Sequence, residues 1–272
     1  MHRFYIPPEN WEPEKWDPEA IILSGSEAHH ARHVLRLKPG NKLVVFNGQG
    51  RESTAEIIHL GRDQIRLHQL GETHAPPPRC RITLGQAIPK GKNMDLIVQK
   101  AVELGAADIA PIISDRTVVS FDSRQAAQKR NKWQQVAIEA AKQCGQNWLP
   151  WVHLPRKFAD FFSDAGLPTL SDGQQNPKDA RTDPVALQQL RLIGSLASDA
   201  QHLKNVLAHY LNNHRDLPAR VLMMIGPEGD FTPAELDVAK SHGCLPITLG
   251  RIILRVETAA IYCLSVLSYE LL

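Results

Sequence analysis

The sequence lacks the long apolar run that a membrane-spanning helix needs, because no stretch approaches about 18 uninterrupted apolar residues. Residues 1–6 lead directly into Pro7 and Pro8, without the apolar core of a secretory signal peptide. We therefore expect a cytoplasmic protein. Hydrophobic residues make up 43% and charged residues 22% of the 272 residues, which is close to the average of globular domains and excludes a disordered, collagen-like or coiled-coil chain.

Cysteine is also scarce. The four cysteines, Cys80, Cys144, Cys244 and Cys263, are scattered and form no Cys-x-x-Cys pair. Disulfide frameworks and structural zinc sites are typically recognised by closely spaced cysteine pairs. We therefore predict neither, expect the cysteines to be reduced packing residues, and predict no metal site.

The chain has little excess charge, with a formal net charge of +2, but its charge is unevenly distributed. Residues 79–148 carry 11 Lys and Arg against 6 Asp and Glu. Residues 28–51 carry five Lys or Arg and three His and no acidic residue. A single cluster of this kind is typical of a solvated surface. Two clusters favour a polyanionic partner such as RNA, because phosphate contacts supply most sequence-independent nucleic-acid affinity.

Three consecutive prolines at 76–78 mark a linker, because proline cannot continue a helix or a central strand. We place the boundary there and predict two domains, residues 1–74 and residues 79–272. Before the prolines, a hairpin turn at 47–50, a short helix at 27–37 and several β-favouring runs predict a small β-barrel. The expected strands are 4–6, 21–23, 42–46, 54–58 and 64–70.

After the prolines, apolar strands alternate with amphipathic helices, which is the pattern of an α/β domain with a parallel sheet. We expect strands at 82–88, 109–113, 151–154, 167–171, 220–225 and 245–249. We expect helices at 94–104, 133–142, 185–213 and 257–272. Residues 172–184 are polar and irregular and predict a surface insertion.

A glycine-bracketed turn at 226–229 directly follows the strand that ends at Ile225. Thr232 and Glu235 have the spacing of a capping box, with Pro233 at the first helical position. Ligands bind at the carboxyl ends of the strands in α/β sheets, so we interpret the turn as a ligand loop. A tight turn before a well-capped helix is the alternative. The run is not Gly-x-Gly-x-x-Gly and does not indicate a dinucleotide site.

A second loop follows the strand that ends at Leu249. Gly250 turns the chain, and two arginines, Arg251 and Arg255, precede Glu257 and an apolar helix. Helix capping and surface charge explain these residues as well as a ligand site does. Taken alone, this segment does not distinguish a ligand site from a capped helix with surface charge.

Together the two segments resemble the ribosomal small-subunit methyltransferase E family, SPOUT enzymes that methylate N3 of a uridine in 16S ribosomal RNA. The matching runs are Gly-Pro-Glu-Gly-Asp-Phe at 226–231 and Leu-Gly-Arg-Ile-Ile-Leu-Arg-Val-Glu-Thr-Ala at 249–259. Runs at 3–6, 29–36, 90–105, 114–116 and 133–145 also match in order, so the resemblance covers nearly the whole chain. The chain departs from the family pattern at Asp230, where glycine is usual, and at Ile252 and Gln146, where arginine is usual.

The resemblance implies an α/β protein with an N-terminal PUA-like, RNA-binding small β-barrel and a C-terminal SPOUT domain that contains a trefoil knot. It implies S-adenosyl-L-methionine as the cofactor. Glycines would let the backbone approach that ligand closely. The implied cofactor-binding residues are Ile225, Gly226, Pro227, Glu228, Gly229, Leu249, Gly250, Ile253, Leu254, Thr258 and Ala259.

The implied catalytic residues are Arg255, Glu257, Arg116 and Glu139. Methyl transfer to the uracil nitrogen releases a proton, so a base is expected, and a cation such as Arg116 or Arg255 can stabilise negative charge on the uracil oxygens. Glu139, Glu228 and Glu257 are all open as the base. The implied RNA-binding residues are Arg3, His30, Arg32, Arg36, Arg51, Lys90 and Lys92.

The implied partners are 16S ribosomal RNA in the 30S subunit and a second copy of the chain. The apolar last helix would pack against that copy, although burial in its own core explains the apolar stripe equally well. Two other functions stay open. One is a SPOUT methyltransferase that acts on another RNA, and the other is a non-catalytic RNA-binding factor in ribosome assembly.

Overall fold

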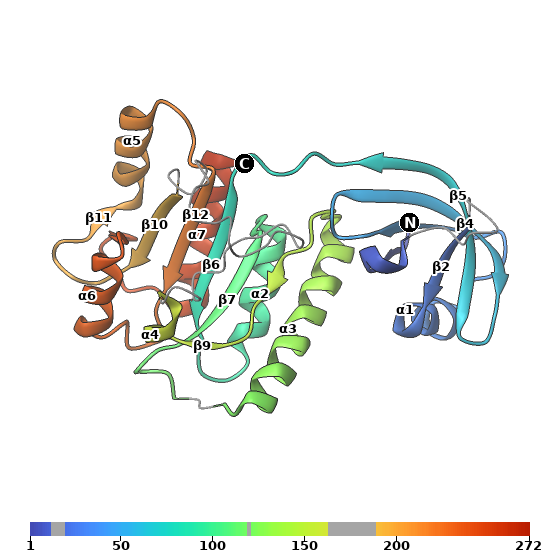
Figure 1. The fold of residues 1–272 in the computed structure, drawn as a ribbon, viewed down its shortest axis with the longest axis horizontal. Coiled ribbons are helices and arrows are strands. Elements are labelled where there is room, and N and C mark those ends of the chain that lie inside the picture. Colours follow the sequence, from blue (N-terminus) through green and yellow to red (C-terminus); the bar gives the residue numbers. More distant parts are fainter. Residues whose placement is uncertain (12–19, 119–120, 163–188) are drawn as a thin grey trace, which may run out of the picture. The chain divides into compact units, whose positions relative to one another are not determined.

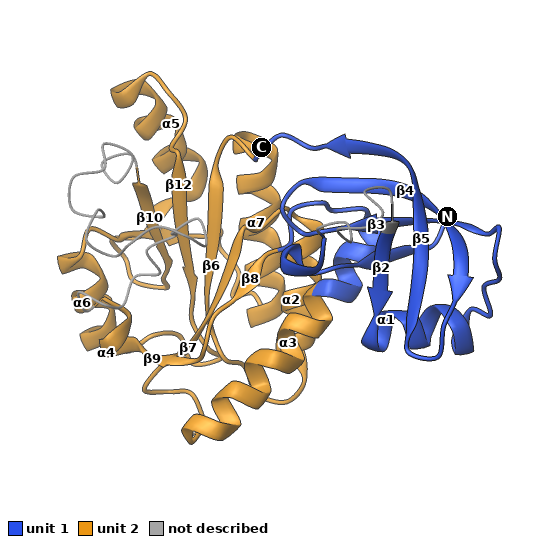
Figure 2. Ribbon diagram, turned by 45° about the vertical axis from the view of Figure 1, so that its right-hand side comes forward, with its two compact units in different colours: residues 1–77, 138–149 blue, residues 78–137, 150–272 orange. Residues whose placement is uncertain are grey.

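The computed structural model describes residues 1–11, 20–118, 121–162 and 189–272. The chain divides into two compact units, shown in different colours in Figure 2. Unit 1 is Met1–Pro77 with Ile138–Leu149, and unit 2 is Pro78–Ala137 with Pro150–Leu272. The predicted strand at 167–171 and the predicted insertion at 172–184 lie outside the described residues. The predicted domain bounds, 1–74 and 79–272, stay a prediction.

In the described part of unit 1, the strands form a five-stranded sheet in the order β1-β3-β4-β5-β2, of which Figure 1 labels β2, β4 and β5. They are β1 (Arg3–Tyr5), β2 (Ala20–Ser24), β3 (Lys42–Phe46), β4 (Arg51–Leu60) and β5 (Gln64–His74). β1 runs parallel to β3, and the other pairs are antiparallel. Alternate residues of β3, Leu43 and Val45, are fully buried, as the two-residue period of a strand requires. Each predicted strand of this region is present.

The helix predicted at 27–37 is shorter and divided. A short 3-10 turn, η1 (Pro8–Asn10), precedes it, and the helix itself consists of α1 (Gly25–His29) and a π-helical turn, η2 (His30–Val34). Arg36 has a φ of 54°, which a right-handed helix cannot include. The helix therefore ends at Val34, before the predicted end at residue 37.

Unit 1 includes a segment that is distant in sequence, residues 138–149, which contains the end of α3 (Ser123–Cys144). The Lys142 ammonium lies 3.0 Å from the Glu27 carboxylate. The Arg3 guanidinium donates to the Asn147 amide oxygen at 2.6 Å, and the Trp148 indole donates to a linker carbonyl at 2.9 Å. These contacts are long-range in sequence, and no local pattern predicts them.

In the described part of unit 2, the strands form an eight-stranded parallel sheet. The order is β11-β13-β10-β12-β6-β7-β8, and β9 also pairs with β7. The strands are β6 (Arg81–Ala87), β7 (Asp108–Ile113), β8 (Trp151–Val152), β9 (Arg156–Lys157), β10 (Gln189–Gly194), β11 (Gln201–His202), β12 (Arg220–Ile225) and β13 (Leu245–Thr248). The central strands β6 and β12 are buried along almost their whole length, as expected for a parallel sheet covered on both faces.

Helices flank this sheet. In addition to α3, they are α2 (Asn93–Glu103), α4 (Phe158–Phe161), α5 (Leu203–His214), α6 (Pro233–Ser241) and α7 (Val256–Leu271). The α/β fold class is confirmed, whereas the trefoil knot stays a prediction. None of the described helices is long and apolar enough to cross a membrane.

The helix predicted at 185–213 is wrong over the described residues 189–202. The described part begins as strand β10, continues through a loop and the short strand β11, and becomes helical only at Leu203. Leu190 and Leu192 are buried and Arg191 between them is not, which is the alternation of a strand. Pairing of β10 with both β12 and β13 stabilises this strand, and the local helical pattern could not reveal that pairing.

The last helix packs against its own unit. Leu264, Leu267 and Leu271 are buried, and α7 contacts α2, β6 and β12. The apolar stripe is therefore explained by the core of unit 2. Tyr262 and Tyr269 remain exposed on the same helix.

Candidate active site

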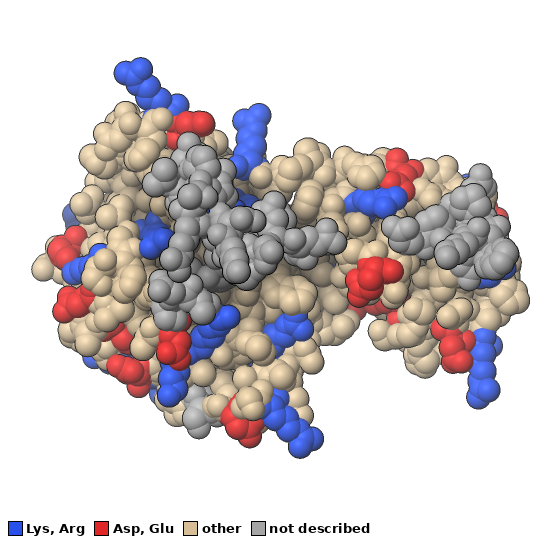
Figure 3. Space-filling model, viewed as in Figure 1, with Lys and Arg blue, Asp and Glu red and all other residues tan. Residues whose placement is uncertain are grey.

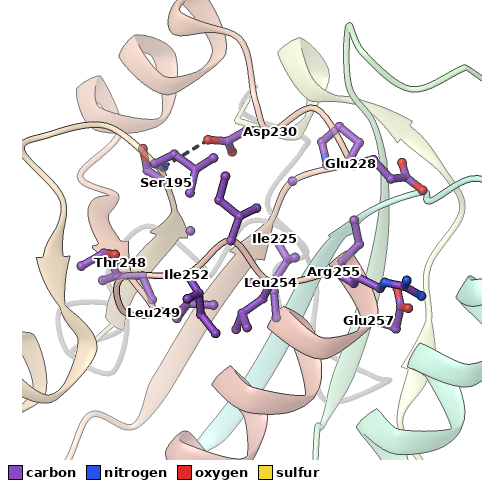
Figure 4. Close-up of a pocket in the computed structure, with 18 of the residues that line it drawn as sticks. Ser195, Ile225, Glu228, Asp230, Thr248, Leu249, Ile252, Leu254, Arg255 and Glu257 are labelled. Carbon is purple, nitrogen blue, oxygen red and sulfur yellow. Dashed lines mark hydrogen bonds between the residues drawn. The ribbon is translucent and has the colours of Figure 1, made fainter.

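A cavity of about 440 Å³ lies in unit 2, at the carboxyl ends of β10, β12 and β13 and beside the start of α7. Figure 4 shows side chains from these four elements around one space. Its size is within the range of small-molecule sites, and its position is where parallel sheets bind ligands. The sequence and the family resemblance placed ligand loops at two of these strand ends.

Most of the predicted cofactor-binding residues line this cavity. They are Ile225, Gly226, Pro227, Glu228, Leu249, Gly250, Ile253, Leu254 and Ala259. Gly229 and Thr258 are not among the lining residues. Segments separated by about twenty residues in the sequence are thus brought together at one site.

The turn after β12 is closed by a hydrogen bond from the Asp230 amide to the Pro227 carbonyl at 3.0 Å. A Cβ atom on Gly226 would lie 3.1 Å from the Asp230 carboxylate and 3.1 Å from the Phe231 amide nitrogen, so the close packing favours glycine there. The predicted capping box is confirmed, since Thr232 and Glu235 accept hydrogen bonds from each other's backbone amides.

Three carboxylates tie this turn and helix to neighbouring loops by accepting backbone amides. Glu228 accepts the amide of Lys90 at 2.8 Å, in the loop after β6. Asp230 accepts the amide of Leu196 at 3.1 Å, in the loop after β10, and Glu235 accepts that of Asp115 at 2.9 Å, after β7. Hydrogen bonds to an ionised acceptor are stronger than neutral ones, so these contacts define the loop geometry.

Arg255 and Glu257, two of the predicted catalytic residues, both line the cavity at the start of α7. Their side chains lie next to each other in Figure 4. The Asn93 amide donates to the Glu257 carboxylate at 3.2 Å and orients it. Arg116 is not a lining residue, but its guanidinium donates to the Gly229 carbonyl.

Glu139 is the fourth predicted catalytic residue, and the structure does not bring it to this group. It belongs to unit 1, is exposed, and its carboxylate lies 3.0 Å from the Lys142 ammonium. The cavity consists of residues of unit 2 alone.

Several lining residues were missed from the sequence. They are Asn93, Gly194, Ser195, Leu196, Asp230, Ile247, Thr248, Ile252 and Val256. The loop at 195–196 was missed because the strand before it was assigned to a helix. The alternation of apolar and polar residues in 189–192 is the signal that finds it.

Among the predicted RNA-binding residues of unit 1, Arg3 and Arg51 are engaged internally. Arg3 pairs with Glu52, and its guanidinium lies over the Phe46 ring. Arg51 donates two hydrogen bonds of 3.0 Å to the Glu72 carboxylate. Chiefly because of Arg51, the pKa of Glu72 lies below its usual range.

The other predicted RNA-binding residues are more accessible, except that His30 is half-buried with its ring edge against Phe4. Arg32 is exposed beside a cavity of about 390 Å³ that His29 and His33 also line. The exposed residues Arg36, Lys90 and Lys92 complete the set. On the face in Figure 3, the Lys and Arg side chains of the described residues are interspersed with Asp and Glu and form no continuous basic patch.

Three of the four cysteines are buried. Burial raises the pKa of the Cys80, Cys244 and Cys263 thiols to about 12, so they are protonated at neutral pH. Cys144 is exposed, unlike the buried packing residue that we expected. Residues 1–11, 20–118, 121–162 and 189–272 contain no cluster of three or more His, Cys, Asp or Glu that could hold a metal ion.

Comparison with known proteins matches each of the two regions of the chain to a domain family. Residues 76–268 match the RNA methyltransferase domain family, and residues 23–69 match the RNA methyltransferase PUA domain. The chain is 31% identical to ribosomal RNA small subunit methyltransferase E of Mesomycoplasma hyopneumoniae, over 97% of this chain and 98% of that protein. It is 27% identical to the Bacillus subtilis protein of the same name, over 99% and 97%.

Two solved structures are similar to this chain over nearly its whole length. A methyltransferase of Legionella pneumophila, solved with bound S-adenosylmethionine, is 30% identical with a TM-score of 0.77, covering 99% of this chain and 98% of that one. Ribosomal RNA small subunit methyltransferase E of Neisseria gonorrhoeae, also solved with S-adenosylmethionine, is 27% identical with a TM-score of 0.76 and the same coverage. The predicted family is confirmed: the chain belongs to the ribosomal RNA small subunit methyltransferase E family.

Proposed function

We propose that this protein is an S-adenosylmethionine-dependent methyltransferase that methylates N3 of a uridine in 16S ribosomal RNA of the small ribosomal subunit. The observation that carries the proposal is the cavity at the carboxyl ends of β10, β12 and β13, which collects most of the residues implied for the cofactor. The names of its relatives support ribosomal RNA as the substrate. Such an enzyme would act in the cytoplasm.

The residues of the cavity fit this cofactor. Apolar side chains such as Leu249 and Leu254 suit an adenine ring, and the glycines at 226 and 250 leave backbone groups accessible to it. The carboxylates of Glu228 and Glu257 suit a ligand that carries positive charge. When bound, the cofactor supplies an electrophilic methyl group.

We favour Glu257 as the base that takes the N3 proton. Its carboxylate faces the cavity and is oriented by the Asn93 amide. The Glu228 carboxylate is already used to hold the Lys90 amide, which makes it the weaker candidate. In this proposal Arg255, which lines the cavity beside Glu257, stabilises negative charge on the uracil carbonyl oxygens.

For RNA binding we favour the exposed cations over the paired ones. Arg32, Arg36, Lys90 and Lys92 are exposed, whereas Arg3 is committed to an internal ion pair. Removing a cation that binds a phosphate should lower the affinity for RNA and reduce its salt dependence. An Arg32→Ala, Arg36→Ala variant that bound 30S subunits like the wild type at every salt concentration would remove this surface from the proposal.

We also infer a homodimer. Ile252, Ile253 and Tyr269 are 73%, 78% and 86% exposed, so their apolar and aromatic surface is accessible to a second copy of the chain. Sedimentation equilibrium tests this, and we expect Tyr269→Glu to shift the equilibrium towards monomer. A monomeric wild type at micromolar concentration would contradict it.

The first test is a calorimetric titration of the protein with S-adenosylmethionine. We expect saturable binding, and loss of binding in a Glu228→Ala, Arg255→Ala variant. If the wild type shows no binding, the titration is repeated with 30S subunits present. No binding in either case would reject the proposed cofactor site.

The second test measures the product. Small ribosomal subunits from cells that lack this methylation are incubated with protein and cofactor, and digested nucleosides are analysed by mass spectrometry. We expect N3-methyluridine, and a rate at least about 100-fold lower for Glu257→Gln if Glu257 is the base. A different methylated nucleoside would indicate another target. Cofactor binding without any product would indicate a non-catalytic assembly factor.

A further inference from the structure

Asp230 has an unusual backbone conformation for a residue that is not glycine. Its φ is 62°, in the left-handed region that, after glycine, Asn and Asp adopt most readily. Its two carboxylate oxygens accept separate backbone amides, that of Phe231 at 2.8 Å and that of Leu196 at 3.1 Å. In Figure 4 a dashed line joins Asp230 to the segment of Ser195 across the cavity wall.

The segment that Asp230 holds has two other contacts close by. The Ala197 amide donates to the buried Ser195 hydroxyl at 3.1 Å. The amide of Ser195 bonds to the Ile247 carbonyl at 2.9 Å, so the loop is anchored where β10 ends. One residue later, the Leu196 side chain is 62% exposed and contributes little packing, yet it lines the cavity. The Asp230 carboxylate therefore determines where this part of the wall lies.

We propose that Asp230 is a positioning residue that ties two walls of the cavity together and thereby raises the affinity for the cofactor. The proposal rests on the proposed function, because it takes the occupant of the cavity to be S-adenosylmethionine. A loop that is free before binding must be ordered when the ligand arrives, which weakens binding. A loop that is already held in place avoids this loss.

Asp230→Gly is a clean test, because it removes the carboxylate at a position whose φ is positive. Glycine adopts a positive φ without strain, so the variant removes the carboxylate and keeps the backbone conformation. Asp237→Asn is the matched control: Asp237 is exposed on α6, does not line the cavity, and its replacement removes the same charge. Asp230→Asn keeps one acceptor oxygen and a side chain that tolerates the left-handed region.

We expect Asp230→Gly to weaken S-adenosylmethionine binding about tenfold in calorimetry, as is typical for loss of a hydrogen bond to a charged group. Asp230→Asn should fall between it and the wild type, and Asp237→Asn should match the wild type. In turnover, the KM for the cofactor should rise while kcat at saturating cofactor stays within about twofold. A general structural defect would instead lower kcat and the melting temperature.

Hydrogen exchange of the Leu196 amide tests the tether without any cofactor. It should be at least about tenfold faster in Asp230→Gly than in the wild type. Wild-type cofactor affinity together with wild-type exchange in Asp230→Gly would overturn the proposal. If the wild-type protein binds no S-adenosylmethionine, the proposed function and the role of Asp230 in affinity both fail, and the exchange rate still decides whether the tether exists.

Discussion

The two units use their carboxylates in different ways. In unit 1, the carboxylates of Glu27, Glu52 and Glu72 pair with the cations of Lys142, Arg3 and Arg51. Around the cavity of unit 2, the carboxylates of Glu228, Asp230 and Glu235 accept backbone amides of neighbouring loops. An ion pair can be exchanged for apolar packing, whereas an amide that loses its acceptor is left without a partner. These three carboxylates of unit 1 thus join segments through ion pairs, and the three around the cavity shape loops, although unit 2 also contains ion pairs such as Arg81 with Asp108.

The largest effect we expect comes from the most buried pair of unit 1. The Lys142 and Glu27 side chains are only 8% and 12% exposed. Lys142→Met leaves a buried carboxylate uncompensated and should lower the free energy of unfolding by about 3–5 kcal/mol. Adding Glu27→Leu should restore much of it. Urea unfolding measures the stability of the single and the double variant. If Lys142→Met alone stays within about 1 kcal/mol of the wild type, the ion pair does not stabilise unit 1 as we expect.

A smaller effect is expected at Glu235, the most buried of the three loop-binding carboxylates. It is 5% exposed and accepts the amides of Thr232 and Asp115. Glu235→Gln replaces one acceptor oxygen by a donor and should lower the free energy of unfolding of unit 2 by about 1–3 kcal/mol. Hydrogen exchange at the Asp115 amide should increase. Unchanged exchange there would show that the carboxylate does not shape the loop.

Removing only the helix cap should have less effect. Thr232→Ala deletes the hydroxyl that accepts the Glu235 amide but leaves the carboxylate bond to Asp115 intact. The expected loss is about 1 kcal/mol, seen as a shift of the thermal midpoint. If Thr232→Ala destabilises the protein as much as Glu235→Gln does, the effect of Glu235→Gln comes from the lost helix cap and not from the lost hydrogen bond to the Asp115 amide.

The smallest effect is expected for a partly exposed pair of unit 1, and it depends on pH. Arg51, with smaller contributions from Gln69 and His74, lowers the pKa of Glu72 in the folded state. The stabilisation is therefore present above the ordinary carboxyl pKa of about 4.3 and is lost as pH falls through the lowered value. The stability difference between wild type and Glu72→Gln should shrink on acidification. A difference that is constant from pH 7 to pH 2 would exclude the ion pair as its source.

Local sequence patterns predicted much of the secondary structure. The strands at 42–46 and 220–225 have the predicted bounds, and the capping box at Thr232 is present. In each case the pattern that determines the element lies within a few adjacent residues. The strand at 189–194 was missed because its short apolar run also fits a helix, and only pairing with β12 and β13 decides between them.

The sequence by itself determined most of the elements and the two loops that belong to the cavity, because periodicity, capping residues and turn glycines act over short distances. The order of its motifs indicated the family. Only the tertiary structure decided which loops meet. Glu228 and Lys90 are 138 residues apart, and Asp230 and Leu196 are 34 apart. Their contacts depend on the strand order β13-β10-β12-β6, which places the carboxyl ends of distant strands side by side. That order results from long-range pairing, which the composition of any single segment does not specify.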